Sequence, residues 1–428
     1  MTRSMRIGER RGQEALETGG TLVPAVQKGQ MFLIGSIMVL IGLIMLKNLL
    51  AVYTTVEETR FQETNIIDKQ LSNVVNEYEN IIGLASLNGY DNGVSYLSNF
   101  SGFLRNDIDS EILYSFVFAN GTTQRYNVTI GNYLGDKINL TVNVTDSVIY
   151  DKDASLVMPL DNDTLDYSDY DNDGTNNGAN CSVSGKYGTA CEFDGVGDHI
   201  NLGTSVSFIS DMTGTIEFWV KPNDISTEQS IFEVDGTVYL IFEVRNNGFK
   251  IDHGSNQVVI NVTLTAGNWY HVVWTSDGST WRGYLNGVEK TLLVSGSNNG
   301  DWFGDVSSPT YVQFGKHGAS GLYFNGSIDE VAIYNRSLSA EEIWEDYMSS
   351  YKSRFFALDD KTNVTRTFKA VKNTTVNMTI EYLRQDNKIK EFVPFMVSTK
   401  NLVTGFFDVK LKSSDITVRV KDVYNRTW

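Results

Sequence analysis

One stretch of the sequence, DYSDYDNDGTNNGANCS at residues 166–182, combines residue types that can bind a metal ion. Starting at Asp169, aspartates at positions 1, 3 and 5 and Gly174 at position 6 follow the first half of a 12-residue calcium loop, whose oxygens converge on the ion around a sharp turn. Position 12 is Asn180, which cannot supply the bidentate carboxylate that calcium needs there, and the pattern predicts no flanking helices. We expect a solvated loop, with peripheral calcium binding as the second interpretation.

The sequence lacks the residue patterns that most often carry catalysis. It contains no Gly-X-Ser-X-Gly nucleophile motif and no phosphate-binding loop. The four histidines are scattered and form no His-Glu-X-X-His motif: His199, His253, His271 and His317. We therefore expect that the protein is not an enzyme.

The two cysteines, Cys181 and Cys191, lie ten positions apart on either side of the turn SGKYG. In an extracytoplasmic compartment a disulfide between neighbouring strands fits this spacing, because paired strands bring opposite Cβ atoms to within about 5 Å. Two buried thiols and a metal pair are the alternatives. A two-cysteine zinc site would need histidines nearby, which this region does not supply.

The N-terminal region predicts the compartment in which these side chains lie. Residues 31–53 read MFLIGSIMVLIGLIMLKNLLAVY, which at 1.5 Å per residue is long enough to cross a hydrocarbon core of about 30 Å. Basic residues precede this span and acidic residues follow it, so the positive-inside rule places the N-terminus in the cytoplasm and the rest of the chain outside the cell membrane. The predicted parts are a cytoplasmic leader at 1–29, a single transmembrane helix at 30–53 and a stalk helix at 54–85.

The junction QKGQMFLIGS resembles the archaeal class III signal of type IV pilin-like proteins, in which a basic-Gly pair precedes Gln and an apolar helix. The resemblance implies cleavage between Gly29 and Gln30 and pilin-like neighbours as partners. Ile34 departs from it, because polymerising pilins usually have Glu at that position. An uncleaved single-pass anchor is the alternative.

The stalk carries an apolar stripe at mostly helical spacing. We expect it to pack on the protein's own β domain, with a second copy or a pilus neighbour as alternatives. Its members are Phe61, Ile67, Leu71, Val74, Tyr78 and Ile81.

From Ser86 onward the pattern changes to short alternating strands such as KINLTVNVT and TVNMTIEYL. The segments 86–152 and 352–428 are both β-rich, and each is small for a core of its own. They are possible halves of one membrane-proximal domain with the central region inserted, an arrangement that is tolerated when a domain's termini lie close together.

Glycosylation sequons and charge agree with an exposed surface protein. The formal charge of −17 excludes nucleic acid as a favoured partner, since the surface repels phosphate. Fourteen Asn-X-Ser/Thr sequons all lie beyond the membrane span, and strand alternation turns several of them to solvent. They are at Asn99, Asn120, Asn127, Asn139, Asn143, Asn162, Asn180, Asn261, Asn325, Asn335, Asn363, Asn373, Asn377 and Asn425.

The central region, 153–351, resembles the LamG-like jelly-roll family, a branch of the concanavalin A-like lectin and glucanase superfamily. The resemblance rests on LVMPLDND, SGKYGTACEFDGVGDHINLG, MTGTIEFWVKP, AGNWYHVVWTSDGSTWRGYLNGVEK and NGSIDEVAIYNRSLSAEEIWEDY, in this order. It implies two antiparallel sheets packed face to face. The expected fold is mainly β: a jelly-roll sandwich plus a smaller β domain on an N-terminal helix.

The resemblance also implies one structural Ca²⁺. Mapped onto this sequence, its candidate ligands are Asp161, Asp194 or Asp198, and Asp329. Asp329 lies within the apolar strand IDEVAIY, where a carboxylate needs either a cation or hydrogen bonds. The alternative is that Asp329 accepts backbone hydrogen bonds and no metal is present.

Glucanases of this superfamily place their carboxylates in a Glu-X-Asp-X-X-Glu strand, a pattern that Glu217 in TIEFWVKP does not begin. LamG-like domains commonly bind glycans or proteins through loops at one rim, where Trp302 and Phe303 are candidate exposed aromatics, with the core as their alternative location. We therefore expect a membrane-anchored cell-surface binding or adhesion protein with an extracellular glycan or protein ligand. The alternative is a pilin-like filament subunit, and a glycan-active enzyme is less expected.

Overall fold

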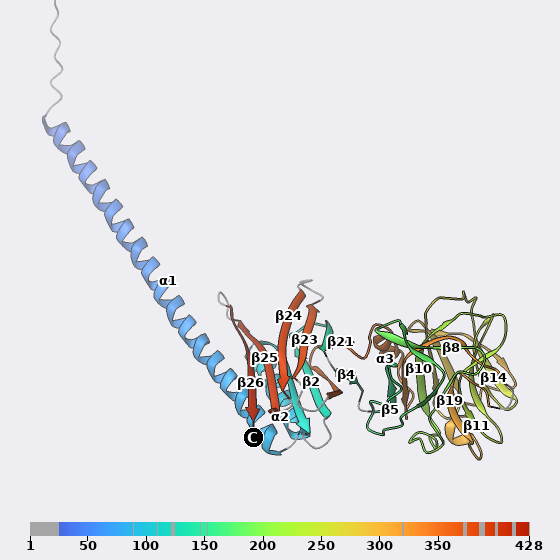
Figure 1. Ribbon diagram of the computed structural model, residues 1–428. Coiled ribbons are helices and arrows are strands. Elements are labelled where there is room, and N and C mark those ends of the chain that lie inside the picture. Colours follow the sequence, from blue (N-terminus) through green and yellow to red (C-terminus); the bar gives the residue numbers. More distant parts are fainter. Residues whose placement is uncertain are drawn as a thin grey trace, which may run out of the picture. The chain divides into compact units, whose positions relative to one another are not determined.

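The computed structural model describes residues 25–88, 90–108, 110–120, 125–145, 147–151, 153–318, 321–370, 375–384, 390–398, 401–412 and 417–427. They form three α-helices, of which the N-terminal one is the longest, and four β-sheets (Figure 1). The chain divides into two units, Met1–Ile66 and Ile67–Trp428, and each is described by itself.

The first unit contains the N-terminal part of helix α1, Ala25–Asn88. The segment Gly35–Glu58 has a mean hydropathy of 2.1 and is not buried, so its length and composition allow it to cross a membrane. The predicted cleavage site between Gly29 and Gln30 lies inside α1, and residues 1–24 of the predicted leader lie outside the described residues.

In the second unit, the remainder of α1 packs through the predicted apolar stripe. Intramolecular packing is confirmed for the stripe members whose side chains are described in this unit, because they share one buried cluster with helix α2 (Tyr90–Asp107) and strand β1 (Ser110–Asn120). These members are Leu71, Val74, Tyr78 and Ile81. The side chains of Phe61 and Ile67 lie outside the description.

The prediction that strands begin at Ser86 is wrong, because residues up to Asp107 are almost all helical. Gly and Asn in YDNGVSYLSNFSG have low helix propensity, but apolar residues at positions 94, 97, 100 and 104 form a helical stripe that packs on α1. Gly93 permits this close approach, since a Cβ atom at this position would overlap the Cβ atom of Ala85. Tertiary packing therefore outweighs the low local helix propensity.

Two antiparallel sheets follow, and each contains strands from before and after the central region. The larger has the order β26-β25-β1-β2-β22-β4, and the smaller has the order β21-β3-β23-β24. We call these two sheets, with α2, the flanking β domain. Its other strands are β2 (Arg125–Tyr133), β3 (Ile138–Thr145), β4 (Ser147–Tyr150), β21 (Ser353–Leu358), β22 (Thr362–Ala370), β23 (Thr375–Arg384), β24 (Lys390–Ser398), β25 (Asn401–Lys412) and β26 (Thr417–Thr427).

The central region is a sandwich of two antiparallel sheets, which confirms the predicted jelly-roll class. The β10 sheet has the order β17-β16-β15-β10-β20-β8-β7, with β5 beside β20. Its strands are β5 (Ala154–Met158), β7 (Asn180–Ser184), β8 (Thr189–Asp194), β10 (Gly214–Pro222), β15 (Tyr270–Ser276), β16 (Trp281–Leu285), β17 (Val288–Lys290) and β20 (Asn325–Tyr334).

The second sheet of the sandwich, the β12 sheet, has the order β18-β14-β13-β12-β11-β19-β9-β6. Its strands are β6 (Thr175–Asn177), β9 (His199–Asn201), β11 (Gln229–Asp235), β12 (Leu240–Arg245), β13 (Gly248–His253), β14 (Asn256–Asn261), β18 (Leu292–Ser295) and β19 (Tyr311–Phe314). Residues from both sheets fill one apolar core.

Strand β10 shows how alternation builds both faces of its sheet. Ile216, Phe218 and Val220 lie in the core, as their spacing predicts. Trp219 points to the other face, where it is 3 % exposed and stacks on Tyr347 with ring centroids 5.6 Å apart. The cover that Trp219 requires therefore comes from helix α3, Ala340–Tyr347.

Local signals for turns and caps are confirmed. Asn286 and Gly287 have φ of 54° and 75° and connect β16 to β17, as an Asn-Gly hairpin requires. Helix α3 begins at Ser339, whose hydroxyl accepts a hydrogen bond from the Glu342 N–H while the Glu342 carboxylate accepts one from the Ser339 N–H. These features close the sandwich at its C-terminal end.

Candidate ligand-binding face

The aspartate-rich loop at residues 166–182 is organised by the buried carboxylate of Asp166. This carboxylate accepts hydrogen bonds from the backbone N–H groups of Val157 at 2.9 Å, Ser168 at 2.8 Å and Asn172 at 2.8 Å. Asp173 in turn accepts one from the Asp166 N–H at 2.7 Å. The loop therefore uses its oxygens internally, and within the described ranges no three His, Cys, Asp or Glu side chains gather in a way that could hold a metal ion.

Two of the four calcium candidates lie at the turn formed by residues 185–189. Asp329 Oδ2 accepts hydrogen bonds from the N–H groups of Lys186 at 2.7 Å and Tyr187 at 3.1 Å, and Asp161 Oδ1 accepts one from the Thr189 N–H at 2.7 Å. Burial, together with the charge of Asp161, raises the pKa of Asp329 to about 7. Asp329 Oδ1 is buried and makes no hydrogen bond.

The other two candidates, Asp194 and Asp198, form a separate turn. Asp194 Oδ1 accepts hydrogen bonds from the N–H groups of Val196 at 2.8 Å and Gly197 at 3.1 Å, which lower the pKa of Asp194. Asp198 Oδ2 accepts one from the Asp194 N–H at 3.0 Å. Among the residues whose placement is described, this pair does not join the other two aspartates in one ligand set.

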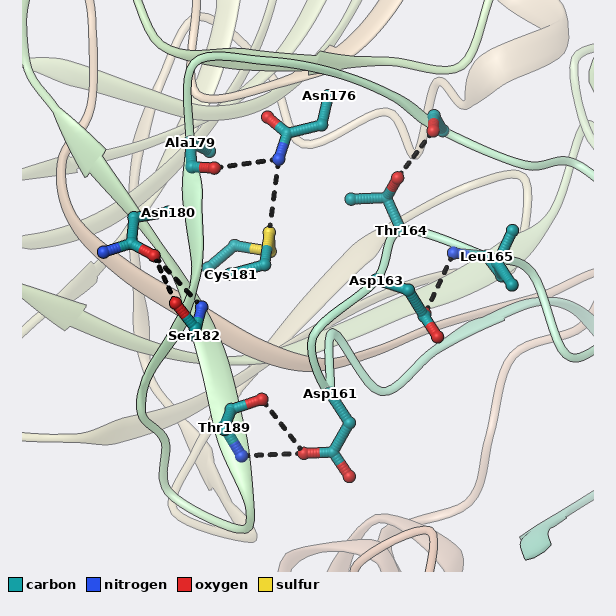
Figure 2. Close-up of a disulfide and its surroundings, with 12 residues drawn as sticks. Asp161, Asp163, Thr164, Leu165, Asn176, Ala179, Asn180, Cys181, Ser182 and Thr189 are labelled. Atoms are coloured by element: carbon teal, nitrogen blue, oxygen red, sulfur yellow. Dashed lines mark hydrogen bonds between the residues drawn. A yellow bond between two sulfur atoms is a disulfide. The ribbon is translucent and has the colours of Figure 1, made fainter.

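The predicted disulfide between Cys181 and Cys191 is confirmed, and it joins β7 to β8 (Figure 2). Asn180, the neighbouring sequon residue, is exposed. Its Oδ1 accepts hydrogen bonds from the Ser182 N–H at 3.2 Å and the Ser182 hydroxyl at 2.7 Å. Figure 2 shows Asn180 and Ser182 in the same close-up as Asp161 and Thr189.

The sequon asparagines differ in exposure. Six have exposed side chains: Asn99, Asn162, Asn180, Asn261, Asn335 and Asn363. The half-buried ones are Asn127, Asn139, Asn143 and Asn325, and the side chains outside the description are those of Asn120, Asn373, Asn377 and Asn425. Glycan attachment stays a prediction at all of them.

Trp302 and Phe303 are core residues and not exposed rim aromatics. Both are fully buried, with Trp302 edge-on to Phe242 at 5.9 Å and Phe303 against Phe208 at 5.3 Å. Their short 3₁₀ turn closes one end of the sandwich, where the core needs apolar cover. A ligand-binding surface must therefore be found elsewhere.

The β12 sheet turns a set of polar side chains away from the core. Because side chains alternate along a strand, residues between the core positions share this outer face, and the strand register places Glu233 opposite Gln313 and Glu243 opposite Lys250. We call this set the polar face. It consists of Glu228, Glu233, Asp235, Glu243, Arg245, Lys250, Asp252, Tyr311, Gln313 and His317.

Glu233 and His317 form a buried pair on the polar face. Glu233 Oε1 accepts hydrogen bonds from Gln313 Nε2 at 3.0 Å and the Gly318 N–H at 2.7 Å. Glu233 Oε2 is hydrogen-bonded to His317 Nδ1. The hydrogen bond to Glu233 raises the pKa of His317, so the imidazole keeps its proton to a higher pH than usual. In the protonated ring, Nε2–H is the second hydrogen-bond donor.

Lys250 is the centre of a second group on the polar face. Its Nζ lies 2.5 Å from Glu243 Oε2, 3.2 Å from Asp252 Oδ2 and 3.3 Å from Glu228 Oε1, and Arg245 Nη1 lies 3.1 Å from the same Glu228 oxygen. Burial alone would lower the pKa of Lys250, but the hydrogen bond and charge of Glu243 outweigh burial and raise it. The floor of the polar face is therefore a fixed ionic network.

Exposed side chains border this buried floor. Tyr311, opposite Asp235 in the strand register, is 48 % exposed, and the side chain of Glu228 is 41 % exposed. The ring of Tyr239 lies edge-on to His317 with centroids 4.9 Å apart. The polar face thus combines carboxylate acceptors, charged donors and aromatic rings, which suits a ligand with many hydroxyl groups.

Sequence reasoning did not single out Glu233 and His317 as a pair. One signal was available. Glu233 and Asp235 have the spacing of the first two carboxylates in the glucanase Glu-X-Asp-X-X-Glu pattern, although Val238 stands where the pattern has its final Glu. The partner His317 lies 84 positions away. Its contact depends on β11 and β19 being neighbours, which the sequence alone does not reveal.

A comparison with known protein families matched part of the central region. Residues 194–344 match the family model described as concanavalin A-like lectin/glucanases superfamily. The central region therefore contains a segment similar to this superfamily. Among curated proteins, none matches this chain.

Several solved structures have a similar fold. Domain 4 of AbnA, a GH43 extracellular arabinanase from Geobacillus stearothermophilus, in complex with arabinotriose, is 20 % identical, with 47 % of this chain and 99 % of that chain covered and a TM-score of 0.37. The Ruminococcus gnavus IT-sialidase CBM40, bound to α2,3 sialyllactose, is 16 % identical, with 36 % and 94 % covered and a TM-score of 0.31. Trypanosoma rangeli sialidase is 17 % identical, with 41 % and 29 % covered and a TM-score of 0.32. These likenesses say nothing about the ligand of this chain.

Replacing His317 should remove a pH-dependent contribution to stability. Because the pKa of His317 is raised in the folded state, its proton stabilises the fold fully below about pH 6.5 and less as the pH rises through the raised value. Between about pH 6 and about pH 9, the unfolding free energy of the wild type in urea should fall more than that of His317→Gln. His199→Gln, in a separate turn, should behave like the wild type, and an equal pH dependence in all three proteins contradicts the assignment.

Proposed function

We propose that the protein is a membrane-anchored cell-surface protein that binds carbohydrate through the polar face of its jelly roll. The observation that carries the proposal is the buried ionic floor bordered by exposed Tyr311, in a domain of the concanavalin A-like superfamily. The apolar segment of α1, the charge asymmetry around it and the sequons support a location outside the cell.

The charges of the polar face favour neutral glycans as ligands. Five carboxylates lie there with three basic side chains, so an acidic sugar would meet net repulsion, whereas sugar hydroxyls can donate to the exposed carboxylate of Glu228. The five are Glu228, Glu233, Asp235, Glu243 and Asp252, and the three are Arg245, Lys250 and His317.

Binding without hydrolysis fits the polar face better than glucanase chemistry does. The two oxygens of Glu233 are engaged by Gln313, Gly318 and His317, so this carboxylate is not free to attack a sugar. Retaining hydrolysis also needs a second carboxyl about 5 Å away to protonate the leaving group, and Asp235 instead accepts a hydrogen bond from the Thr310 hydroxyl at 2.8 Å.

Tyr311→Ala should weaken glycan binding at least tenfold, because it removes the exposed aromatic surface of the polar face. The measurement is a glycan-array screen with the full chain in detergent, followed by titration of the best neutral oligosaccharide. Tyr170→Ala is the matched control, since Tyr170 is 50 % exposed in a different part of the domain and should bind as the wild type does. Absence of any glycan binding contradicts carbohydrate recognition. Equal binding by both variants means that the binding site does not include Tyr311.

A second candidate function is a pilin-like subunit of a surface filament. The continuous 64-residue helix α1 and the junction at Gly29 and Gln30 favour it. Mass spectrometry of the mature protein separates the two candidates. An N-terminus at Gln30 supports prepilin-type processing, whereas an N-terminus at Met1 or Thr2 supports an uncleaved anchor.

A structural Ca²⁺ is a further part of the proposal. The free oxygen of Asp329 and the nearby Asp161 support it, with backbone carbonyls of the turn at 185–189 as further oxygens. Lys352, whose Nζ lies 2.5 Å from Asp161 Oδ2, would have to move aside. Calcium at about 100 times its dissociation constant should then stabilise the wild type by about 2.7 kcal/mol, and Asp329→Asn should lose this effect. An identical melting temperature with calcium and with a chelator contradicts the site.

A further inference from the structure

A buried charged cluster lies between the outer face of the β10 sheet, helix α3 and strand β21. Glu217 on β10 and His271 on β15 are 3 % and 2 % exposed, and Asp346 on α3 and Arg354 on β21 are also buried. Glu217 Oε1 accepts a hydrogen bond from the Tyr334 hydroxyl at 3.3 Å, and Glu217 Oε2 lies 3.7 Å from His271 Nε2. Four elements thus meet at these side chains.

Arg354 is the residue by which the flanking β domain enters the cluster. Its strand β21 pairs with β3 in the smaller sheet of that domain, while its Nη2 forms an ion pair with Asp346 Oδ1. Beside this pair, Glu345 Oε1 accepts a hydrogen bond from the Ala357 N–H at 2.7 Å. These contacts join the flanking β domain to the helix that covers the jelly roll.

The cluster carries an excess of negative charge when its acids are ionised. Three carboxylates, those of Glu217, Glu330 and Asp346, line the same cavity as the single guanidinium of Arg354. Burial raises the pKa of Glu217 to about 7 and that of Asp346 to about 7, and it raises the pKa of Glu330 as well. Burial lowers the pKa of His271 to about 4, so this imidazole is neutral at neutral pH.

The cavity among these side chains has a volume of about 10 Å³, which is room for one water molecule. Four buried polar atoms of the cluster make no hydrogen bond: Glu217 Oε2, His271 Nδ1, the Tyr351 hydroxyl oxygen and Arg354 Nε. The cluster is therefore not saturated, in contrast to Glu233 on the polar face. Other charged or titratable groups that act on it from surrounding elements are Lys186, Asp329, Glu330, Tyr334, Glu345 and Arg366.

We propose that Glu217, Asp346 and Arg354 form a proton-operated latch that holds the flanking β domain on the jelly roll. With one proton shared by the two acids, the guanidinium balances the remaining charge and β21 stays docked. When that proton leaves, two carboxylates share one guanidinium in a buried space with few other donors, which weakens docking. The latch does not depend on the proposed glycan binding.

The direction of the pH effect follows from proton linkage. Glu217 and Asp346 bind a proton more tightly when docked than when exposed, so their contribution to docking is full at low pH and is lost as the pH rises through about 7. His271 acts in the opposite direction, because once exposed it would take up a proton below about pH 6.5. The range above about pH 6.5 therefore isolates the two acids.

Hydrogen–deuterium exchange in the full chain tests the latch. For one proton with a pKa of about 7, the docking constant should fall about fourfold between about pH 6.5 and about pH 8.5. The readout is the protection of the Phe355 and Ala357 amides, which donate hydrogen bonds to Ser349 and Glu345 of the jelly roll, corrected for the intrinsic pH dependence of exchange. The wild type should lose about fourfold in protection over this range.

Glu217→Gln places a neutral side chain at this position at every pH. The protection of the same amides in this variant should therefore stay constant over the same range. Glu289→Gln, an exposed carboxylate on the same sheet, should keep the fourfold fall of the wild type. If Glu217→Gln fails to fold, Asp346→Asn tests the same shared proton. Constant protection in the wild type, or a fourfold fall that persists in the folded latch variant, overturns the proposal.

Discussion

The β10 sheet is buried on both of its faces, and the placement of the surrounding elements follows from this constraint. Its inner face gives Phe218 to the sandwich core, and its outer face carries Trp219 and Ala332. Such a face is costly to leave in water, so helix α3 and the segments around Tyr150 and Tyr351 cover it. The chain before and after the jelly roll is therefore part of the jelly roll's packing.

The two sheets of the sandwich satisfy their outward polar groups differently. On the β12 sheet, Glu233 is engaged by three donors and Lys250 by three carboxylates, so this face is stable against water without further cover. On the β10 sheet, Glu217 lies beneath α3 with one hydrogen bond. The outer face of the β12 sheet, whose polar groups are hydrogen-bonded, suits the proposed binding of an external ligand. The outer face of the β10 sheet, where Glu217 Oε2 makes no hydrogen bond, suits the proposed contact within the protein that responds to protons.

The sequence predicted best those features that depend on neighbouring residues. Alternation in β10, the Asn286-Gly287 hairpin and the Ser339 cap each follow from a few adjacent side chains. The class of the central domain followed from several motifs in order. The apolar helix that is long enough to cross a membrane also follows from local composition, because length and apolarity are properties of one segment.

Features that depend on distant partners were missed. Helix α2 lies within the segment that was predicted to be β-rich, whereas its packing on α1 decides its structure. Trp302 was a candidate for an exposed aromatic residue at the rim, but the fold buries it in the core. The pairing of Glu233 with His317 depends on which strands are neighbours in a sheet, information that lies in the topology and not in any single stretch of sequence.

The jelly roll is connected to the flanking β domain at both of its ends, through β4, which pairs with β22, and through β21, which pairs with β3. These two strands belong to different sheets. Tension applied to the jelly roll would divide between two covalent connections, and each would load its own ladder of hydrogen bonds. A domain connected in this way resists pulling better than one attached at the end of a single linker.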